Sequence, residues 1–231
     1  MSVGWIEDAK RRAAVEAVKE VKDGFVVGLG SGSTAAYAIK EIGRRIREEE
    51  LHVIGVPTSF QSLFLAIKCG VPTTTLHEKP VIDLTIDGAD QIDDELNLIK
   101  GMGGALTREK IIAASSKRLI IVADERKLTR KLGLRQLLPV EILSFAKPLV
   151  TKKLREIGGI PRLREIEKGV PYITDNGNFI LDVDFGVIEN PKELEEKLKM
   201  IPGVVETGLF IGMAHTIYVG TEKGVKKIVK R

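Results

Sequence analysis

The sequence contains a single cysteine, Cys69, among its 231 residues. One cysteine excludes an intrachain disulfide and any metal cluster held by several cysteines. The sequence also lacks a run of about eighteen apolar residues, which a membrane-spanning helix needs. Its first residues, MSVGWIEDAKRR, contain no apolar segment typical of a signal peptide. We therefore expect a cytoplasmic protein that does not associate with a membrane.

Histidine is equally scarce, because only His52, His77 and His215 occur. They lie far apart and do not have the spacing of metal ligands, so we predict no metal site. A serine hydrolase is also disfavoured, because Ser33, the serine in the most glycine-rich early segment, has no obvious histidine partner.

The excess of positive charge is small, since 36 Lys and Arg residues face 32 Asp and Glu residues along the chain. A nucleic-acid-binding protein would need a concentrated basic face, so we expect no nucleic acid partner. The most basic stretch is KGVKKIVKR at residues 223–231. It is typical of a solvated final helix or tail, with a phosphate-binding arm as the alternative.

Apolar runs alternate with helical patterns over the first 130 residues. Residues 6–22 carry apolar side chains at helical spacing. Strands are predicted at residues 25–30, 51–58, 71–76, 81–90 and 118–124, with helices at 31–50, 59–70 and 107–116. Strands that alternate with helices indicate βαβ units and a mostly parallel sheet.

The pattern changes after Lys131 to strand, helix, hairpin and helix. Asn176-Gly177, between two alternating apolar runs, is a strong hairpin signal. We therefore predict an α/β fold with two domains. A Rossmann-like domain comprises residues 1–130 and 207–231, and a smaller inserted α+β (ferredoxin-like) domain comprises residues 131–206 and is expected at an oligomer interface.

Glycine and hydroxyl side chains share the segment between the first predicted strand and its helix, which we call the first glycine loop (residues 28–34, GLGSGST). N–H groups at a helix N-terminus bind anions, and Ser31, Ser33 and Thr34 add donors, so this loop is a candidate phosphate site. A tight turn capped by a hydroxyl is the alternative. A dinucleotide is disfavoured, because Ser33 occupies the third glycine position and the second strand lacks a terminal acid.

Two acids follow a later strand, since Asp87-Gly88-Ala89-Asp90 comes after the apolar run VIDLTI. Ligands of parallel sheets bind at the carboxyl ends of the strands, where these acids could contact sugar hydroxyls or exchange protons. An ordinary Asp-Gly turn is the alternative.

Lys100 begins another glycine-rich segment, which we call the second glycine loop (residues 99–105, IKGMGGA). Lys100 could contact an anionic or hydroxylated ligand. Glu109 falls in the first turn of the next helix, after Thr107 as expected N-cap, where it could simply complement the helix dipole. Lys127 follows another strand end and could be an ordinary solvated lysine.

In this order and spacing, four segments resemble ribose-5-phosphate isomerases of the A family: GLGSGSTAAYAI, DGADQID, LIKGMGGALTREKI and VADERK. The ending GTEKGVKKI fits as well, so the resemblance covers nearly the whole chain. Met102 departs from the family, which commonly has glycine there. The first loop reads SGST where TGST is also common in the family, a change that keeps the hydroxyl.

The resemblance implies an aldose-ketose isomerase that interconverts D-ribose 5-phosphate and D-ribulose 5-phosphate through an enediol(ate), in the non-oxidative branch of the pentose phosphate pathway. It implies Glu109 as the base, Lys100 at the reacting end and Asp87 in ring opening. The implied substrate-binding residues are Lys10, Ser31, Gly32, Ser33, Thr34, Asp87, Gly88, Ala89, Asp90, Lys100, Gly101, Met102, Gly103 and Lys127. No metal or other cofactor is expected. The protein is expected to form a homodimer or a homotetramer.

Two other classes remain as rivals. Amino-sugar phosphate deaminases are disfavoured because their motif differs from the combination found here. A sugar-phosphate sensor would bind its ligand without turnover and would normally carry a DNA-binding segment, which the sequence does not contain.

Overall fold

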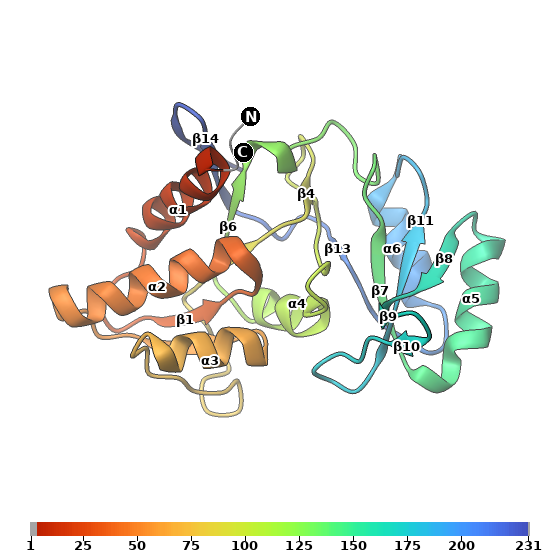
Figure 1. Cartoon of the computed structure of the whole chain (residues 1–231), viewed down its shortest axis with the longest axis horizontal. Helices are drawn as coiled ribbons and strands as arrows, with labels where there is room; N and C mark the ends of the chain where they lie inside the picture. Colours follow the sequence, from red (N-terminus) through yellow and green to blue (C-terminus); the bar gives the residue numbers. More distant parts are fainter. Residues whose placement is uncertain (1–3, 231) are drawn as a thin grey trace. The chain divides into compact units, whose positions relative to one another are not determined.

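The computed structural model describes residues 4–230, which form two compact units. The first unit contains the chain up to Ala89, Arg108–Lys127 and the chain from Met213 onward. The second unit contains Asp90–Thr107 and Leu128–Gly212. Figure 1 labels their helices and strands. No helix in this described part of the chain is long and apolar enough to cross a membrane.

A six-stranded sheet forms the centre of the first unit, in the order β15-β14-β6-β3-β1-β2. Its strands are β1 (Val26–Leu29), β2 (Ile54–Pro57), β3 (Leu84–Gly88), β6 (Leu119–Asp124), β14 (Thr216–Thr221) and β15 (Gly224–Val229). Neighbouring strands are parallel except β15, which runs antiparallel to β14. The predicted parallel sheet is confirmed.

Helices cover both faces of this sheet. Successive strand residues point to opposite faces, so apolar side chains of the strands pack against helices on both sides. The helices are α1 (Gly4–Val18), α2 (Gly32–Glu49), α3 (Phe60–Lys68) and α4 (Leu106–Ala114). Val27 and Leu29 of β1 belong to the core shared with α1, α2 and α3. Gly28 faces the other side, where an added Cβ would meet Ile112 of α4.

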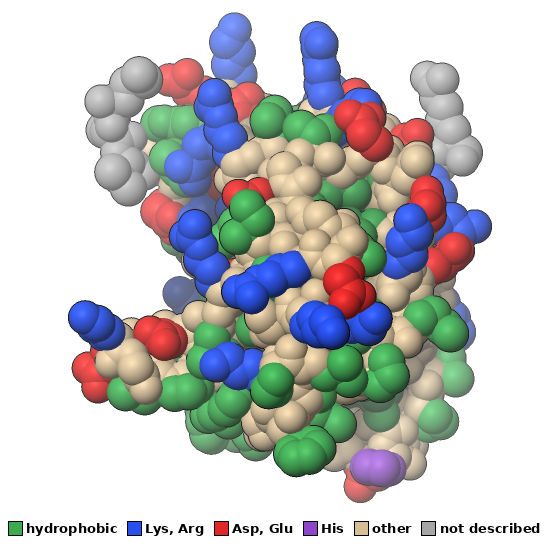
Figure 2. Space-filling model, turned by 90° about the vertical axis from the view of Figure 1, so that its right-hand side faces the viewer, with side chains coloured by type: hydrophobic (Ala, Val, Ile, Leu, Met, Phe, Trp, Pro, Cys, Tyr) green, Lys and Arg blue, Asp and Glu red, His purple; other side chains and the backbone are tan. Residues whose placement is uncertain are grey.

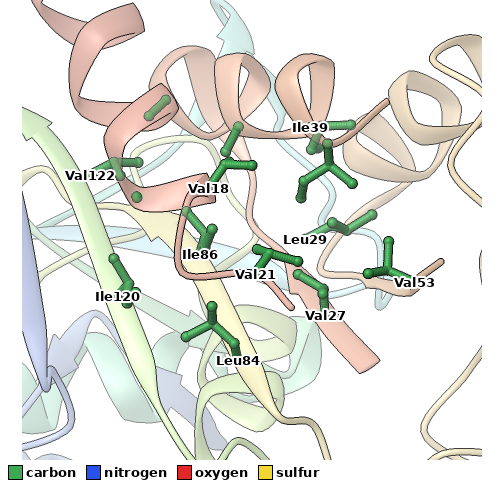
Figure 3. Packing of buried hydrophobic residues seen from close by; sticks show 14 of the residues in the cluster. Val18, Val21, Val27, Leu29, Ile39, Val53, Leu84, Ile86, Ile120 and Val122 are labelled. Carbon is green, nitrogen blue, oxygen red and sulfur yellow. The ribbon is translucent and has the colours of Figure 1, made fainter. Parts of the chain in front are cut away.

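Figure 3 shows the packing of the first core, where Val18 and Val21 meet the strand residues Leu84 and Ile86. Helix α1 buries Ala9, Ala13, Ala14, Ala17 and Val18. These small side chains recur every three to four residues, so one face of the helix can lie close to the sheet.

The second unit contains a four-stranded antiparallel sheet in the order β12-β7-β11-β8. Its elements are β7 (Leu138–Ile142), α5 (Lys147–Glu156), β8 (Ile160–Leu163), β11 (Phe179–Asp184), α6 (Pro191–Lys199) and β12 (Val204–Thr207). This βαββαβ order is the ferredoxin-like motif, as predicted. Val150 and Leu154 of α5 and Leu198 of α6 share its core with Leu181 and Val183.

Short elements complete the second unit. Strands β4 (Gln91–Ile92), β5 (Leu98–Ile99) and β13 (Leu209–Phe210) form a three-stranded sheet, and β9 (Glu165–Glu167) pairs with β10 (Val170–Pro171). Single 3-10 turns are η1 (Glu125–Lys127) in the first unit and η2 (Ser144–Ala146) in the second. The predicted domain boundaries, with residues 131–206 as an insertion, stay a prediction. The compact units additionally group residues 90–107, 128–130 and 207–212 with the ferredoxin-like part.

Two local predictions about strands and tails were wrong. Residues 71–76 do not form a strand, since only a bridge between Thr73 and Gly55 occurs there, next to Pro72, which has no N–H to donate. The basic end of the chain is neither a helix nor a loose tail. Its residues up to Val229 form β15, because Val225 packs against the first core while the segment pairs with β14.

The predicted hairpin at Asn176-Gly177 was also wrong, although the turn exists. Gly177 has φ +78° and donates its N–H to the Thr174 carbonyl. Apart from the Thr174 N–H, which donates to the Asn178 carbonyl at 2.9 Å, the segments on either side form no strand pair; β10 pairs with β9, and β11 pairs with β7 and β8. The turn is instead held by side-chain hydrogen bonds to Glu141, described below.

Candidate active site

The carboxyl ends of β1, β2, β3 and β6 lie along one edge of the parallel sheet, because these strands are neighbours with the same direction. Ser31 follows β1, Thr58 and Ser59 follow β2, Asp87 ends β3, and Lys127 lies in η1 after β6. This is the edge at which α/β folds bind ligands. The parallel direction of these strands therefore brings the predicted polar groups of the first unit to the same edge of the sheet.

Asp87 is almost fully buried, with 1% of its surface exposed. Its Oδ1 accepts hydrogen bonds from the backbone N–H of Ser31 at 3.1 Å and of Gly88 at 2.7 Å. The first glycine loop can approach this carboxylate only because residue 30 is glycine, since a Cβ there would lie 2.2 Å from Oδ1. Asp87 and the first glycine loop thus form one contact.

Ser31 precedes α2 at the N-cap position, but its side chain does not cap the helix. Its hydroxyl contacts the Thr58 hydroxyl at 2.7 Å and the Ser59 hydroxyl at 2.5 Å. The Gly32 N–H donates to Oε1 of Gln61 at 3.2 Å. The alternative of a simple hydroxyl-capped turn was wrong, and the sequence did not point to Thr58, Ser59 or Gln61.

Lys10 reaches the same helix start from α1, with its Nζ donating to the Ser33 hydroxyl at 3.2 Å and to Glu7 at 2.7 Å. The hydrogen bond from Lys10, joined by one from Tyr37, lowers the pKa of Glu7. Ser33 is exposed and Thr34 is partly exposed. A cation beside the positive end of a helix favours an anionic ligand.

Lys127 is half-buried in η1, directly after the buried Asp124 that ends β6. Burial raises the pKa of Asp124, but hydrogen bonds from Arg126 and the charges of Arg126 and Lys127 outweigh it and lower the pKa. Lys127 therefore belongs to a compact charged group, whereas the sequence alternative was an ordinary solvated lysine.

Glu109 lies in the first turn of α4 and is 5% exposed. A glutamate that only complements a helix dipole would be solvated, so burial argues against that alternative. Thr107 is not the N-cap that the sequence suggested, because α4 already begins at Leu106. Its hydroxyl instead donates to Oε2 of Glu141 at 2.6 Å.

The second unit carries Asp90 and the second glycine loop. Lys100 is 3% exposed, its N–H donates to the Gly208 carbonyl at 2.9 Å, and its Nζ lies 5.3 Å from the centre of the Phe210 ring. The Met102 N–H donates to Oδ2 of Asp90 at 3.0 Å. The structure thus joins Asp90 to a residue of the second glycine loop twelve positions further along. The Met102 side chain is 44% exposed.

Glu141 is the main polar residue that the sequence did not identify. It is fully buried in β7, and besides Thr107 it accepts hydrogen bonds from Thr174, Asn176 and Asn178 at 2.8–3.0 Å. A charged residue inside the apolar run LPVEI was the available signal, because a buried carboxylate requires partners. Glu141 ties the start of α4 to the 174–178 turn.

Fold and polar groups together define an α/β protein of the kind that binds small ligands at the carboxyl ends of its parallel strands. Residues 54–224 match the family described as ribose 5-phosphate isomerase A (phosphoriboisomerase A). The chain belongs to this family.

Similar proteins span almost its whole length. The ribose-5-phosphate isomerase A of Methanosarcina acetivorans is 54% identical over 96% of this chain and 94% of its own. The solved structure of ribose 5-phosphate isomerase A from Methanocaldococcus jannaschii has a TM-score of 0.93 at 47% identity, covering 97% of this chain and 99% of its own. A D-ribose-5-phosphate isomerase in complex with phospho-erythronic acid has a TM-score of 0.94 at 42% identity, with the same coverage.

Proposed function

We propose that this chain interconverts D-ribose 5-phosphate and D-ribulose 5-phosphate by proton transfer through an enediolate. Family membership over nearly the full chain carries this proposal. The solved relative bound to phospho-erythronic acid supports a sugar phosphate as the ligand. The non-oxidative pentose phosphate pathway is the proposed setting.

Glu109 is the proposed base. An aldose-ketose shift needs one carboxylate that removes the proton from C2 of the open-chain aldose and returns it to C1. Glu109 is buried in the first turn of α4, and burial of a carboxylate tunes it for proton transfer, which supports this role. Because the same carboxylate gives back the proton that it removed, the reaction requires no redox cofactor.

Lys100 is proposed to stabilise the enediolate. Negative charge develops on the oxygens of C1 and C2 as the proton leaves, and a buried ammonium group opposes that charge strongly. Burial at 3% exposure supports the assignment. Asp87 is the proposed group for ring opening, through proton exchange with the ring or anomeric oxygen.

The remaining residues are proposed to bind the substrate. Ser31, Gly32, Ser33, Thr34, Lys10 and Lys127 supply donors and positive charge, while Gly88, Ala89, Asp90, Gly101, Met102 and Gly103 contribute the backbone and carboxylate groups around the sugar. Distant contacts of this kind orient the reacting carbons.

Self-association as a homodimer or homotetramer is a further proposal. Apolar side chains of the second unit are strongly exposed, with Phe145 at 97%, Met200 at 82% and Ile166 at 71%. Figure 2 shows hydrophobic side chains lying among Lys and Arg on one face of the molecule. A group of exposed apolar side chains is typical of a surface that binds another protein chain. We also propose a cytoplasmic location, on the strength of the single cysteine.

The test is ketose formation from ribose 5-phosphate by purified protein treated with a chelator. We expect rapid conversion that survives chelation, and about a 1,000-fold lower kcat in Glu109→Gln with substrate affinity largely kept. Glu196→Gln, at an exposed position of α6, is the matched control and should behave as the wild type.

Either of two results would overturn part of the proposal. Near-normal turnover in Glu109→Gln would remove Glu109 from its role. If the wild type binds ribose 5-phosphate in calorimetry but does not convert it, the protein is a sugar-phosphate sensor and not an isomerase.

A further inference from the structure

A single arginine holds the backbone of the second glycine loop. Arg164, between β8 and β9, donates from Nη1 to the Gly101 carbonyl at 2.9 Å and to the Met102 carbonyl at 3.0 Å. Its side chain is only 11% exposed. Two consecutive carbonyl oxygens therefore point at one guanidinium nitrogen, although more than sixty residues separate them from it in sequence.

The guanidinium group is itself fixed from two sides. Its Nε donates to Oδ2 of Asp182 in β11 at 2.8 Å, and Nη2 pairs with the second carboxylate oxygen. The Tyr172 ring lies with its centre 5.9 Å from the guanidinium carbon. A bidentate carboxylate and an aromatic neighbour leave the planar group little freedom, which a lysine in its place would not reproduce.

The direction of the carbonyls sets the direction of the next N–H groups. In a planar trans peptide, the C=O of one residue and the N–H of the following residue point opposite ways. Carbonyls of Gly101 and Met102 that face Arg164 therefore turn the N–H groups of Met102 and Gly103 away from it. The hydrogen bond from the Met102 N–H to Asp90 confirms this orientation for the first of the two.

Tyr172 fixes the other end of the loop. Its hydroxyl donates to the Gly103 carbonyl at 3.3 Å. Gly104 has φ +81°, and a Cβ on it would lie 2.3 Å from the Tyr172 hydroxyl oxygen, so glycine lets the loop pack on the ring. Burial, together with the nearby Asp175 charge, raises the pKa of Tyr172, which keeps its hydroxyl a donor at neutral pH.

We propose that Arg164, locked by Asp182, is a positioning residue of the isomerase: it holds the Met102 carbonyl so that the Gly103 N–H, rather than a carbonyl oxygen, faces the developing enediolate, while the Met102 N–H stays on Asp90. This inference rests on the proposed function. Arg164 touches no reacting atom in it and acts only through the loop backbone. Its loss lets the Met102 carbonyl turn, which places partial negative charge where the intermediate is itself negative, whereas the Gly101 carbonyl keeps the hydrogen bond from the Gly104 N–H at 3.0 Å.

The test compares kcat, KM and inhibitor affinity in Arg164→Gln. We expect kcat to fall about 10- to 100-fold with KM within about threefold, because the lost interaction matters chiefly as charge develops. Affinity for phospho-erythronic acid, used as a probe with an acid group at the reacting end, should fall in parallel with kcat. Affinity for inorganic phosphate should stay within about twofold.

Three variants serve as controls. Arg162→Gln, on exposed β8, removes a guanidinium two residues away and should leave all four constants unchanged. Arg164→Lys keeps the charge without the planar fork and should recover little of the lost kcat. Asp182→Asn should reproduce the same split between kcat and KM in weaker form.

Some results would overturn the inference. Wild-type kcat in Arg164→Gln would do so, and so would equal losses of phosphate and phospho-erythronic acid affinity, which indicate general loosening. If Arg164→Gln does not fold, as judged by near-UV circular dichroism, Asp182→Asn decides in its place. A wild type without isomerase activity sinks the proposed function instead, so the two failures are distinguishable.

Discussion

The two glycine loops look alike in sequence but are held in different ways. The first lies directly on a neighbouring strand end, with the Ser31 N–H on the Asp87 carboxylate and no side chain between Gly30 and Asp87. The second is held by side chains from a segment far along the sequence, chiefly Arg164 between β8 and β9 and Tyr172 after β10. Both loops need a glycine at a close contact, Gly30 on Asp87 and Gly104 on Tyr172, but only the second also depends on a guanidinium group.

The difference matches a difference in proposed work. In the proposed reaction, the helix N-terminus at the first loop binds an anion that keeps its charge throughout. The second loop is proposed to face charge that appears only during proton transfer, so its donors must be oriented before that charge develops. Substitutions in the two loops should accordingly affect different kinetic constants.

The largest effect is expected from removing charge in each loop separately. Lys100→Met should lower kcat about 100- to 1,000-fold with little change in KM, because the ammonium group opposes charge that appears in the transition state. Lys10→Met should instead raise KM about 10-fold and leave kcat within about threefold, since the substrate phosphate is charged at all stages. Steady-state kinetics on both variants measures the split. Equal effects of the two on kcat would break the proposed division of work.

A smaller effect is expected from adding one methyl group to each loop. Gly30→Ala would place a Cβ 2.2 Å from the Asp87 carboxylate and should lower the free energy of unfolding by about 1–3 kcal/mol. Gly103→Ala meets no atom within 4 Å and should change it by less than about 0.5 kcal/mol. Urea denaturation compares the two. A wild-type midpoint for Gly30→Ala would show that the first loop can shift away from Asp87.

The smallest effect is expected from Glu20, which lies away from the carboxyl ends of the parallel strands. Its replacement should change stability and leave turnover unchanged. Glu20 accepts hydrogen bonds from Arg118, just before β6, at 2.6 Å and from Lys227 of β15 at 2.7 Å, and also from Tyr218. Burial raises the pKa of Glu20, but these donors outweigh it and lower the pKa from 4.5 to about 2.

A pKa lowered in the folded state gives stability that is full above about pH 4.5 and is lost as the pH falls toward 2. Glu20→Gln should cost about 1–2 kcal/mol at pH 7, a figure reduced because the basic partners are half-exposed. Its difference from the wild type should shrink below pH 4.5, with kcat unchanged at pH 7. Thermal unfolding from pH 7 to pH 2, with Glu196→Gln alongside, measures this. A difference that is constant with pH would contradict the assigned role.

The parts that the sequence predicted correctly are those set by local pattern. Apolar runs between amphipathic helices were enough for the parallel sheet, and the βαββαβ unit followed from the change of pattern after Lys131. Asp87 and Ser31 could be expected together, because neighbouring parallel strands end at one edge. Their contact depends on strand order, which alternation alone does not specify.

The parts that it missed depend on contacts between distant residues. Arg164, Asp182 and Glu141 occur in segments whose local pattern indicates only strands and turns. The prediction of a hairpin at the 174–178 turn failed for the same reason. The side chains of Thr174 and Asn176 donate hydrogen bonds to Glu141, which lies far away in sequence. The basic segment at the end of the sequence was judged by charge, whereas residues 224–229 form a strand that pairs with β14.

Strand β15 has a consequence for how the protein behaves at high concentration. It forms one edge of the six-stranded sheet, and an edge strand is a template on which another chain can add a strand and start aggregation. Lys226 and Lys227 are exposed along it, so two copies that approached edge to edge would bring like charges together. The lysines of β15 therefore disfavour edge-to-edge association of two copies.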